Sequence, residues 1–300
     1  MEALMKDCMI CPRKCHVNRL EGGKGYCGQT AQLFAARAAL HYWEEPCLSG
    51  TRGSGTVFFS GCNLKCIFCQ NHNIALGRAG NIISIERLVQ IFLELQEQGA
   101  HNINLVTATH FVPQVCCALR QAKAQGLAIP VVYNTGGYEE VGILKLLAGL
   151  VDIYLPDLKY FSSELSERYS HATNYFEKAS SALAEMVRQV GRPVFDETTG
   201  LMKRGVIVRH LILPGETKDS KKVLRYLHES YGNDIYVSIM NQYTPLPHVA
   251  QHHNLNRRVS QEEYDRILTF ADRIGIERGF CQENETASES FIPEFDGTGL

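Results

Sequence analysis

The 300-residue sequence has no large excess of charge of either sign, since 30 Lys and Arg stand against 32 Asp and Glu. Because no basic block is dense enough to follow a phosphate backbone, nucleic acid is not an expected partner. Long apolar runs are also missing, since the most apolar stretch, residues 142–155, is interrupted by Lys145 and Asp152. Residues 1–7 have no apolar signal-peptide core, so we expect a cytoplasmic protein that does not enter membranes.

Cysteine, in contrast, is abundant, with 11 residues. Thiols are kept reduced in the cytoplasm, so this number predicts metal or redox chemistry rather than a disulfide framework. Most of the cysteines fall into two motifs. The remaining four, which we expect to pack as small apolar residues, are Cys47, Cys116, Cys117 and Cys281.

One motif is Cys62-x3-Cys66-x2-Cys69, directly after the apolar stretch 56–59. Iron–sulfur clusters are usually held by four cysteine thiolates, so three compact thiolates without a nearby fourth cysteine predict a cluster that keeps one iron open to another molecule. Zinc is the alternative metal, but its structural sites are tetrahedral and closed. We therefore interpret Cys62, Cys66 and Cys69 as cluster ligands at a catalytic centre.

The other motif, Cys8-x2-Cys11-x3-Cys15-x11-Cys27, precedes the predicted core and offers four thiolates. Four ligands make a closed site, which suits structural zinc or an auxiliary iron–sulfur cluster that passes electrons inward. Unligated thiols are a third interpretation. Spacing alone does not separate the three.

After residue 50, short apolar runs alternate with helical patterns, which is typical of β/α units with a parallel sheet. Ser84 is a candidate N-cap for a helix with one apolar stripe, and Ser260 with Glu263 forms a capping box for a last helix that reaches Ile274. Six units, two fewer than a complete eight-stranded barrel, predict an α/β fold built as an open, partial (β/α)6 barrel with a lateral mouth. The predicted strands are Thr56–Ser60, Ile103–Thr107, Pro130–Asn134, Asp152–Leu155, Val206–Leu211 and Ile235–Ile239.

We divide the chain into three parts on this basis. Residues 1–50 form a small cysteine-rich segment that packs on the barrel, and residues 51–281 form the barrel itself. Residues 282–300 contain five acidic residues and no Lys or Arg, a composition that favours a solvated, flexible tail.

Polar residues gather where the predicted strands end, which is where functional groups of a β/α barrel converge. Any one of them can equally cap a helix or satisfy a loop backbone. Asp157 and Lys159 lie on one face by alternation and can form a simple ion pair. Besides the cysteines, the strand-end residues are Thr107, Thr109, His110, Asn134, Thr135, Asp157, Lys159, Arg209, His210, Asn241 and Gln242.

The segment 53–71, with Gly61-Cys62 at its centre and Cys69-Gln70-Asn71 at its end, resembles the radical S-adenosylmethionine (SAM) superfamily. Within that superfamily it is most similar to proteins like the pyruvate formate-lyase activating enzyme. The likeness continues at 104–106, 131–138, 151–160 and 209–215, and so covers nearly the whole chain. It implies the same six-unit partial barrel and a [4Fe–4S] cluster on the three cysteines.

The resemblance also implies the residues that bind SAM. Asn134, Asp157 and Lys159 would line its pocket, and Arg209 would reach the cofactor or its carboxylate. Relatives commonly hold the methionyl amino group with a Gly-Gly-Glu turn after the second strand, where this chain has residues 106–110 instead. That role then passes to Thr hydroxyls such as that of Thr107 or to backbone carbonyls, and His110 is either a cofactor-binding residue or an acid or base that faces the substrate.

The activity that the resemblance implies is oxidoreductase chemistry in which SAM is reductively cleaved to a 5′-deoxyadenosyl radical that takes a hydrogen atom from a substrate. A glycyl radical enzyme is the implied protein partner, and flavodoxin or ferredoxin the implied electron donor. Three alternatives stay open. The chain can be a radical SAM enzyme that acts on another protein, a peptide or a small molecule, a non-catalytic iron–sulfur electron carrier, or a zinc-dependent interaction module.

Overall fold

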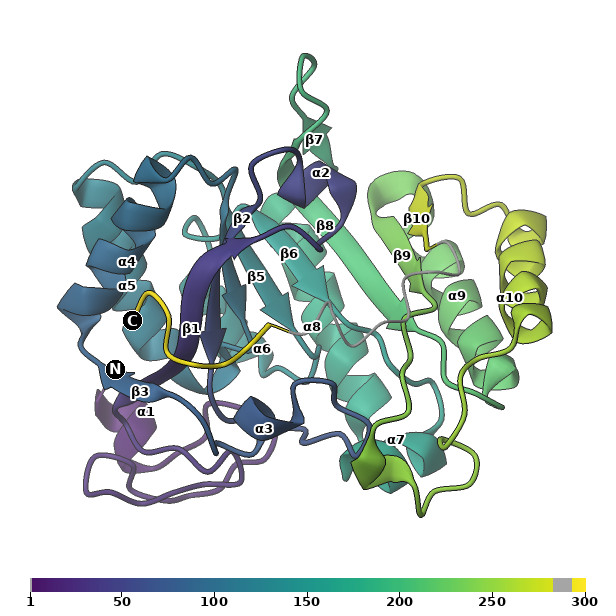
Figure 1. The fold of residues 1–300 in the computed structure, drawn as a ribbon, viewed down its shortest axis with the longest axis horizontal. Helices are drawn as coiled ribbons and strands as arrows, with labels where there is room; N and C mark the ends of the chain where they lie inside the picture. Colours follow the sequence, from purple (N-terminus) through teal and green to yellow (C-terminus); the bar gives the residue numbers. More distant parts are fainter. Residues whose placement is uncertain (1, 283–292) are drawn as a thin grey trace.

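The computed structural model describes residues 2–282 and 293–300 (Figure 1). Its α-helices are α1 (Glu2–Lys6), α2 (Pro46–Ser49), α3 (His72–Ala75), α4 (Ile85–Glu97), α5 (Val112–Ala124), α6 (Val141–Leu144), α7 (Ser163–Ser170), α8 (Tyr175–Val190), α9 (Thr217–Tyr231) and α10 (Gln261–Ile274). Its strands are β1 (Leu33–His41), β2 (Ser54–Phe59), β3 (Asn81–Ile83), β4 (Ile103–Val106), β5 (Val131–Thr135), β6 (Ile153–Pro156), β7 (Val194–Phe195), β8 (Met202–Leu211), β9 (Tyr236–Met240) and β10 (Gly279–Cys281).

One sheet forms the centre of the molecule, with strand order β10-β9-β8-β6-β5-β4-β2-β1-β3 and β7 paired to β8. The six predicted strands correspond to β2, β4, β5, β6, β8 and β9, and each is parallel to the next. In the described part of the chain the end strands β10 and β3 do not pair, so the sheet stays open. The predicted α/β class and partial-barrel architecture are confirmed.

Strand β1 is the main element that the sequence did not predict. It lies within the cysteine-rich segment 1–50, yet it pairs antiparallel with β2 from Ala35 to His41. Its sequence contains four alanines and few β-branched residues, which is a weak strand signal. Pairing with β2 and with β3 (Leu33–Ala35) overrides that local preference, and the N-terminal segment thereby extends the barrel sheet.

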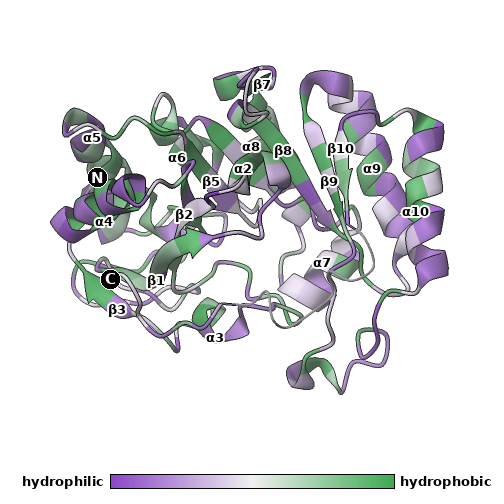
Figure 2. Cartoon of the chain, turned by 45° about the horizontal axis from the view of Figure 1, so that its top comes forward, coloured by the Kyte–Doolittle hydropathy of each residue, from purple (hydrophilic) through white to green (hydrophobic). Residues whose placement is uncertain are grey.

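The outer helices follow the predicted capping signals. The Ser84 hydroxyl accepts a hydrogen bond from the Arg87 amide at the start of α4, and the complete capping box of Ser260 and Glu263 begins α10. Figure 2 shows hydrophilic and hydrophobic residues side by side along α9 and α10, as expected for amphipathic helices. Within the described residues, none of the helices combines the length and the apolar character that crossing a bilayer requires.

The last described residues, 293–300, are called the C-terminal segment below, and they lie against β1 (Figure 1). The Gly297 amide donates to the Ala36 carbonyl at 3.0 Å, and the Ala38 amide donates to the Thr298 carbonyl at 2.9 Å. The Phe295 ring packs edge-on against Phe58, with 5.4 Å between centroids. Residues 283–292 of the predicted flexible tail lie outside the described residues, where flexibility stays a prediction.

Candidate functional site

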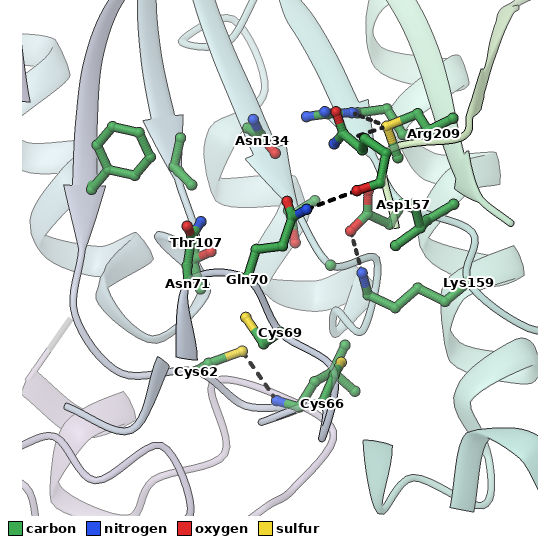
Figure 3. Close-up of a pocket in the computed structure, with 18 of the residues that line it drawn as sticks. Cys62, Cys66, Cys69, Gln70, Asn71, Thr107, Asn134, Asp157, Lys159 and Arg209 are labelled. Atoms are coloured by element: carbon green, nitrogen blue, oxygen red, sulfur yellow. Dashed lines mark hydrogen bonds and ion pairs between the residues drawn. The ribbon is translucent and has the colours of Figure 1, made fainter. Parts of the chain in front are cut away.

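The three-cysteine loop begins directly after β2, which delivers it to the carboxyl end of the parallel sheet. Gly61 precedes Cys62 with a φ of +90°, and a Cβ there would lie 2.6 Å from the Gln29 side chain and 2.8 Å from the Cys27 carbonyl oxygen. Only glycine fits this turn. Figure 3 shows the side chains of Cys62, Cys66 and Cys69 gathered at one end of a pocket.

This pocket is a cavity of about 300 Å³ inside the barrel. Among its lining residues, no fourth cysteine accompanies the three of the loop in the part of the chain that the structure describes. Eight of the predicted site residues line it together: Cys62, Cys66, Cys69, Thr107, Asn134, Asp157, Lys159 and Arg209. The structure thus brings residues from five parallel strands to one place, as the strand-end argument requires.

Asp157 and Lys159, at the end of β6, form an ion pair that faces the cavity (Figure 3). Burial acts to lower the pKa of Lys159, but the attraction of Asp157 and of the Cys66 thiolate outweighs it, so the pKa is raised and the ammonium stays charged. Burial raises the pKa of the Cys66 thiol, and Lys159 opposes that rise. Because a thiolate is the form that binds metal, this lysine favours the ligand state of Cys66.

The turn after β5 holds this ion pair in place. Gly137 has a φ of +81°, and a Cβ on it would lie 2.2 Å from the Asp157 carbonyl oxygen. The Tyr175 hydroxyl accepts from the Lys159 amide at 3.0 Å and lies 2.9 Å from the carbonyl oxygens of Gly136 and Asp157. The ends of β5 and β6 are therefore fixed to each other at the cavity wall.

Arg209, on β8, lies at the far end of the cavity from the cysteines. Its guanidinium pairs with Glu44 at 3.1 Å and with Glu45 at 3.3 Å, between β1 and α2. Burial acts to lower the pKa of Arg209, and the two carboxylates raise it above its usual value. Glu44 and Glu45 were not among the predicted site residues, because no sequence pattern indicated β1 and nothing placed the residues after it in the barrel.

Glu44 also contacts two amides of the sheet, so it connects three strands. One carboxylate oxygen accepts from the Asn104 amide at 3.0 Å and from the Asn134 amide at 3.4 Å. One charged group, called the barrel floor below, consists of Arg209, Glu44, Glu45 and Asn104. Arg209 lines the same cavity as Lys159, and each of these cations is paired with a carboxylate.

His110 is the predicted site residue that the structure does not bring to the cavity. It lies in the short turn Thr109–Phe111, is 1% exposed, and its Nε2 lies 2.9 Å from the Ser60 carbonyl oxygen. Burial and the nearby Arg19 lower its pKa to about 3, so the ring is neutral. The prediction failed because the turn directs this side chain back into the core, whereas Thr107, with a φ of +59°, stays at the cavity.

A buried carboxyl group lies behind the wall that contains Thr135. The Glu139 side chain is 1% exposed and accepts hydrogen bonds from the hydroxyls of Thr109, at 2.6 Å, and Thr135. Burial raises its pKa to about 7, although these hydrogen bonds oppose the rise. Its second oxygen has no hydrogen-bond partner among the described residues, which leaves room for a proton.

The four N-terminal cysteines lie in a segment without regular secondary structure between α1 and β1. Cys8, Cys11 and Cys27 are buried, Cys15 is partly buried, and the Tyr26 amide donates to the Cys15 sulfur at 3.2 Å. Burial, together with the neighbouring thiols Cys27 and Cys15, raises the pKa of Cys11 to about 12. The four thiols therefore form one group in space.

This N-terminal group lies directly against the three-cysteine loop. The Arg13 guanidinium donates to the Asn63 carbonyl at 2.7 Å and to the Ser170 carbonyl at 3.0 Å, and it stacks 3.9 Å from the centre of the Tyr26 ring. The Tyr26 hydroxyl donates to the Leu64 carbonyl at 3.3 Å. The segment thus supports the loop that carries Cys62 and Cys66.

The described cysteines do not come close enough, in either group, to hold a single metal ion with three or more ligands. An iron–sulfur cluster places its thiolates on different iron atoms and so needs a wider arrangement. Three thiols at the end of a cavity, a charged lysine beside them and no fourth cysteine fit a cluster with one open iron. Of the cysteines predicted to pack as apolar residues, Cys47 and Cys116 are buried, whereas Cys281 is exposed and that prediction is wrong for it.

Comparison with known proteins matches residues 56–227 to the model of the Radical SAM superfamily. An uncharacterized protein of Methanocaldococcus jannaschii is 29% identical over 280 residues, which cover 91% of this chain and 77% of that protein.

Among solved structures, SuiB of Streptococcus suis bound to its precursor peptide SuiA matches with a TM-score of 0.50 and 10% identity, over 74% of this chain and 46% of that chain. A domain of the pyruvate-formate lyase-activating enzyme of Bacteroides vulgatus matches with a TM-score of 0.42 and 12% identity, over 58% of this chain and 92% of that chain. At such identities the likeness concerns the fold.

Proposed function

The chain belongs to the radical SAM superfamily, and from that premise we propose that it is an activating enzyme that installs a glycyl radical on a partner protein. The observation that carries this proposal is the position of the three thiols at one end of a cavity whose walls combine apolar side chains with charged and polar ones such as Asp157, Lys159 and Asn134. When bound, a reduced [4Fe–4S] cluster would donate one electron to the sulfonium of SAM, and cleavage of the carbon–sulfur bond would give methionine and a 5′-deoxyadenosyl radical able to take a hydrogen atom from the substrate.

The residues of the cavity divide into two groups in this proposal. Cys62, Cys66 and Cys69 hold the cluster. Lys159, kept charged by Asp157, offers a cation to the SAM carboxylate, and Asn134 and the Thr107 hydroxyl offer hydrogen bonds to its polar groups.

The barrel floor lies at the opposite end of the cavity and completes the site on the substrate side. We propose that the floor, in which Glu44 and Glu45 hold Arg209, is a positioning element for the substrate. The substrate is thereby confined between the floor and the cysteines.

Cleavage of SAM tests the activity. The protein is reconstituted with iron and sulfide without oxygen, reduced with dithionite and supplied with SAM, and 5′-deoxyadenosine is quantified. We expect release by the wild type and only background release by Cys66→Ala, which loses a cluster ligand. Cys281→Ala, at an exposed cysteine outside the cavity, is the matched control and should match the wild type. No release from a protein that holds a complete cluster would favour the electron-carrier alternative instead.

The substrate is tested separately by electron paramagnetic resonance. Lysate, reductant and SAM are added to the reconstituted enzyme, and the protein that accumulates a stable carbon-centred radical is isolated. A glycine-centred signal on a polypeptide supports the activating role. SAM cleavage that instead yields a modified small molecule, with no protein radical, would assign the chain to another branch of the superfamily.

We further propose that Cys8, Cys11, Cys15 and Cys27 hold a second metal centre. It is either an auxiliary cluster, whose irons take separate thiolates, or zinc, which would draw the thiols closer together than they lie in this structure. The support is the group of three buried thiols and a partly buried fourth in a segment with little core of its own, together with its contacts to the cluster loop through Arg13. Cys11→Ser should lower the content of one metal, measured as zinc and iron per chain, and lower the stability of the fold. Unchanged metal content and unchanged stability would contradict this centre.

The electron donor that we propose is a small reductant protein such as flavodoxin or ferredoxin, working in the cytoplasm. The eleven cysteines of the chain are all free thiols, a state that a reducing compartment maintains. Reduction of the cluster by purified flavodoxin, followed as loss of its visible absorbance, tests this part.

A further inference from the structure

The edge of β1 that faces away from β2 is only partly paired. Strand β3 covers Leu33–Ala35, and the C-terminal segment bonds to Ala36 and Ala38. Because backbone groups alternate in direction along a strand, the N–H and C=O of Leu40 point to the same outer side as those of Ala38. Within residues 2–282 and 293–300, no strand pairs with this side of β1 beyond Ala38.

A hollow of about 160 Å³ lies beside this free edge. Leu40 and Tyr42 line it from the β1 side, and Pro293 of the C-terminal segment lines it from the other side. The hollow and the main cavity lie side by side, since they share four lining residues: His41, Trp43, Phe58 and Pro293. The free edge is therefore next to side chains that also line the cavity inside the barrel.

Two adjacent aromatic residues flank this hollow at the surface. Tyr42 is 51% exposed and Trp43 is 60% exposed, which is unusual for side chains of this size. The C-terminal segment already bonds to the neighbouring positions of the same edge, which shows that the edge exchanges main-chain hydrogen bonds with another segment. An exposed strand edge beside aromatic side chains is a surface on which peptides add as a further strand.

We propose that Leu40–Tyr42 binds an extended segment of the polypeptide substrate as an added strand and directs the following residues past Trp43 into the cavity. This inference rests on the proposed function. The α-carbon of a glycine within a polypeptide reaches the cavity only if the chain on both sides of it is extended. Main-chain hydrogen bonds supply most of the affinity, and the aromatic pair and the hollow set the register.

The sequence contains a single tryptophan, Trp43, so tryptophan emission reports on this edge alone. The reconstituted enzyme is titrated without oxygen with a pool of synthetic octapeptides that have a central glycine and random flanks. We expect a saturable change in emission, together with slower hydrogen exchange of the segment that contains Leu40 and Tyr42. A second pool, N-methylated at alternate residues, keeps the side chains but cannot pair, and should bind at least tenfold more weakly.

A pair of variants tests the same hydrogen bond from the enzyme side. Leu40→Pro removes the outward N–H without removing a bond to β2, so it should weaken peptide binding at least tenfold. Leu40→Ala keeps the N–H and changes only the side chain that lines the hollow, so it should bind clearly more tightly than Leu40→Pro. Equal binding of the two peptide pools, or no response of Trp43 to either, would overturn the proposal. So would a concentration-dependent dimer that Leu40→Pro dissolves, since the edge would then pair with a second copy of the chain.

Release of 5′-deoxyadenosine is measured in the same samples without peptide, so that the two hypotheses fail separately. If 5′-deoxyadenosine is released but the two pools bind equally, the hypothesis of a peptide-binding edge is rejected and that of radical SAM activity is kept. A clear difference between the pools with no 5′-deoxyadenosine removes the proposed function and leaves a peptide-binding edge.

Discussion

Replacing Glu139 with Gln should change how the stability of the fold depends on pH. The folded protein holds this carboxyl group with a pKa of about 7, against 4.5 in the unfolded chain. Between these values the folded state keeps a proton that the unfolded state has lost, so the free energy of unfolding falls as pH rises through this window. The gap of roughly 2.5 in pKa corresponds to about 3 kcal/mol at ~1.4 kcal/mol per pKa unit.

Urea unfolding of the reduced apoprotein at several values between pH 4.5 and 7.5 measures this effect. Gln keeps an oxygen that accepts from Thr109 and Thr135 but cannot ionise, so the variant should gain about 3 kcal/mol relative to the wild type from pH 4.5 to 7. Glu185→Gln is the control, because Arg188 lowers the pKa of Glu185 to about 2, so that its own contribution to stability changes with pH mainly below 4.5. Parallel pH profiles for the wild type and Glu139→Gln would refute the reasoning.

Three further substitutions test the cavity. Lys159→Gln should raise the Kd for SAM at least tenfold in equilibrium dialysis while the far-UV spectrum stays unchanged, and an unchanged Kd would remove Lys159 from the cofactor site. Glu44→Gln leaves Arg209 with one full carboxylate and should lower the free energy of unfolding by about 3 kcal/mol, as breaking a buried ion pair does, whereas a fully stable variant would argue against a buried barrel floor. His110→Asn should reduce stability without changing the Kd for SAM, and a weakened Kd would place this residue at the cofactor after all.

Parallel strands end at a common edge whatever their side chains are. The prediction that residues such as Asn134, Asp157 and Lys159 lie together at one cavity therefore agrees with the structure. Each of these positions follows an apolar run whose length determines where the strand stops. The six-unit count and the helix caps at Ser84 and Ser260 depend on equally local signals. All of these features could therefore be predicted from short stretches of sequence.

The remainder of the site depends on contacts that no local pattern encodes. Strand β1 forms because it pairs with β2 and β3, although its alanines favour a helix. Glu44 enters the barrel only as a result of that pairing. His110 lies near a strand end like Thr107, but the tight turn at Thr109–Phe111 directs its side chain into the core, whereas that of Thr107 lines the cavity. Residue type alone does not predict such a turn.

The crowding at Gly137 limits how this protein can diverge. With 2.2 Å between a hypothetical Cβ and the Asp157 carbonyl oxygen, even alanine at this position would force the fourth parallel strand away from the third. Asp157 and Lys159 would move with it. Homologues that share this chemistry should accordingly have glycine at this position, including those whose loop and surface sequences have otherwise diverged strongly.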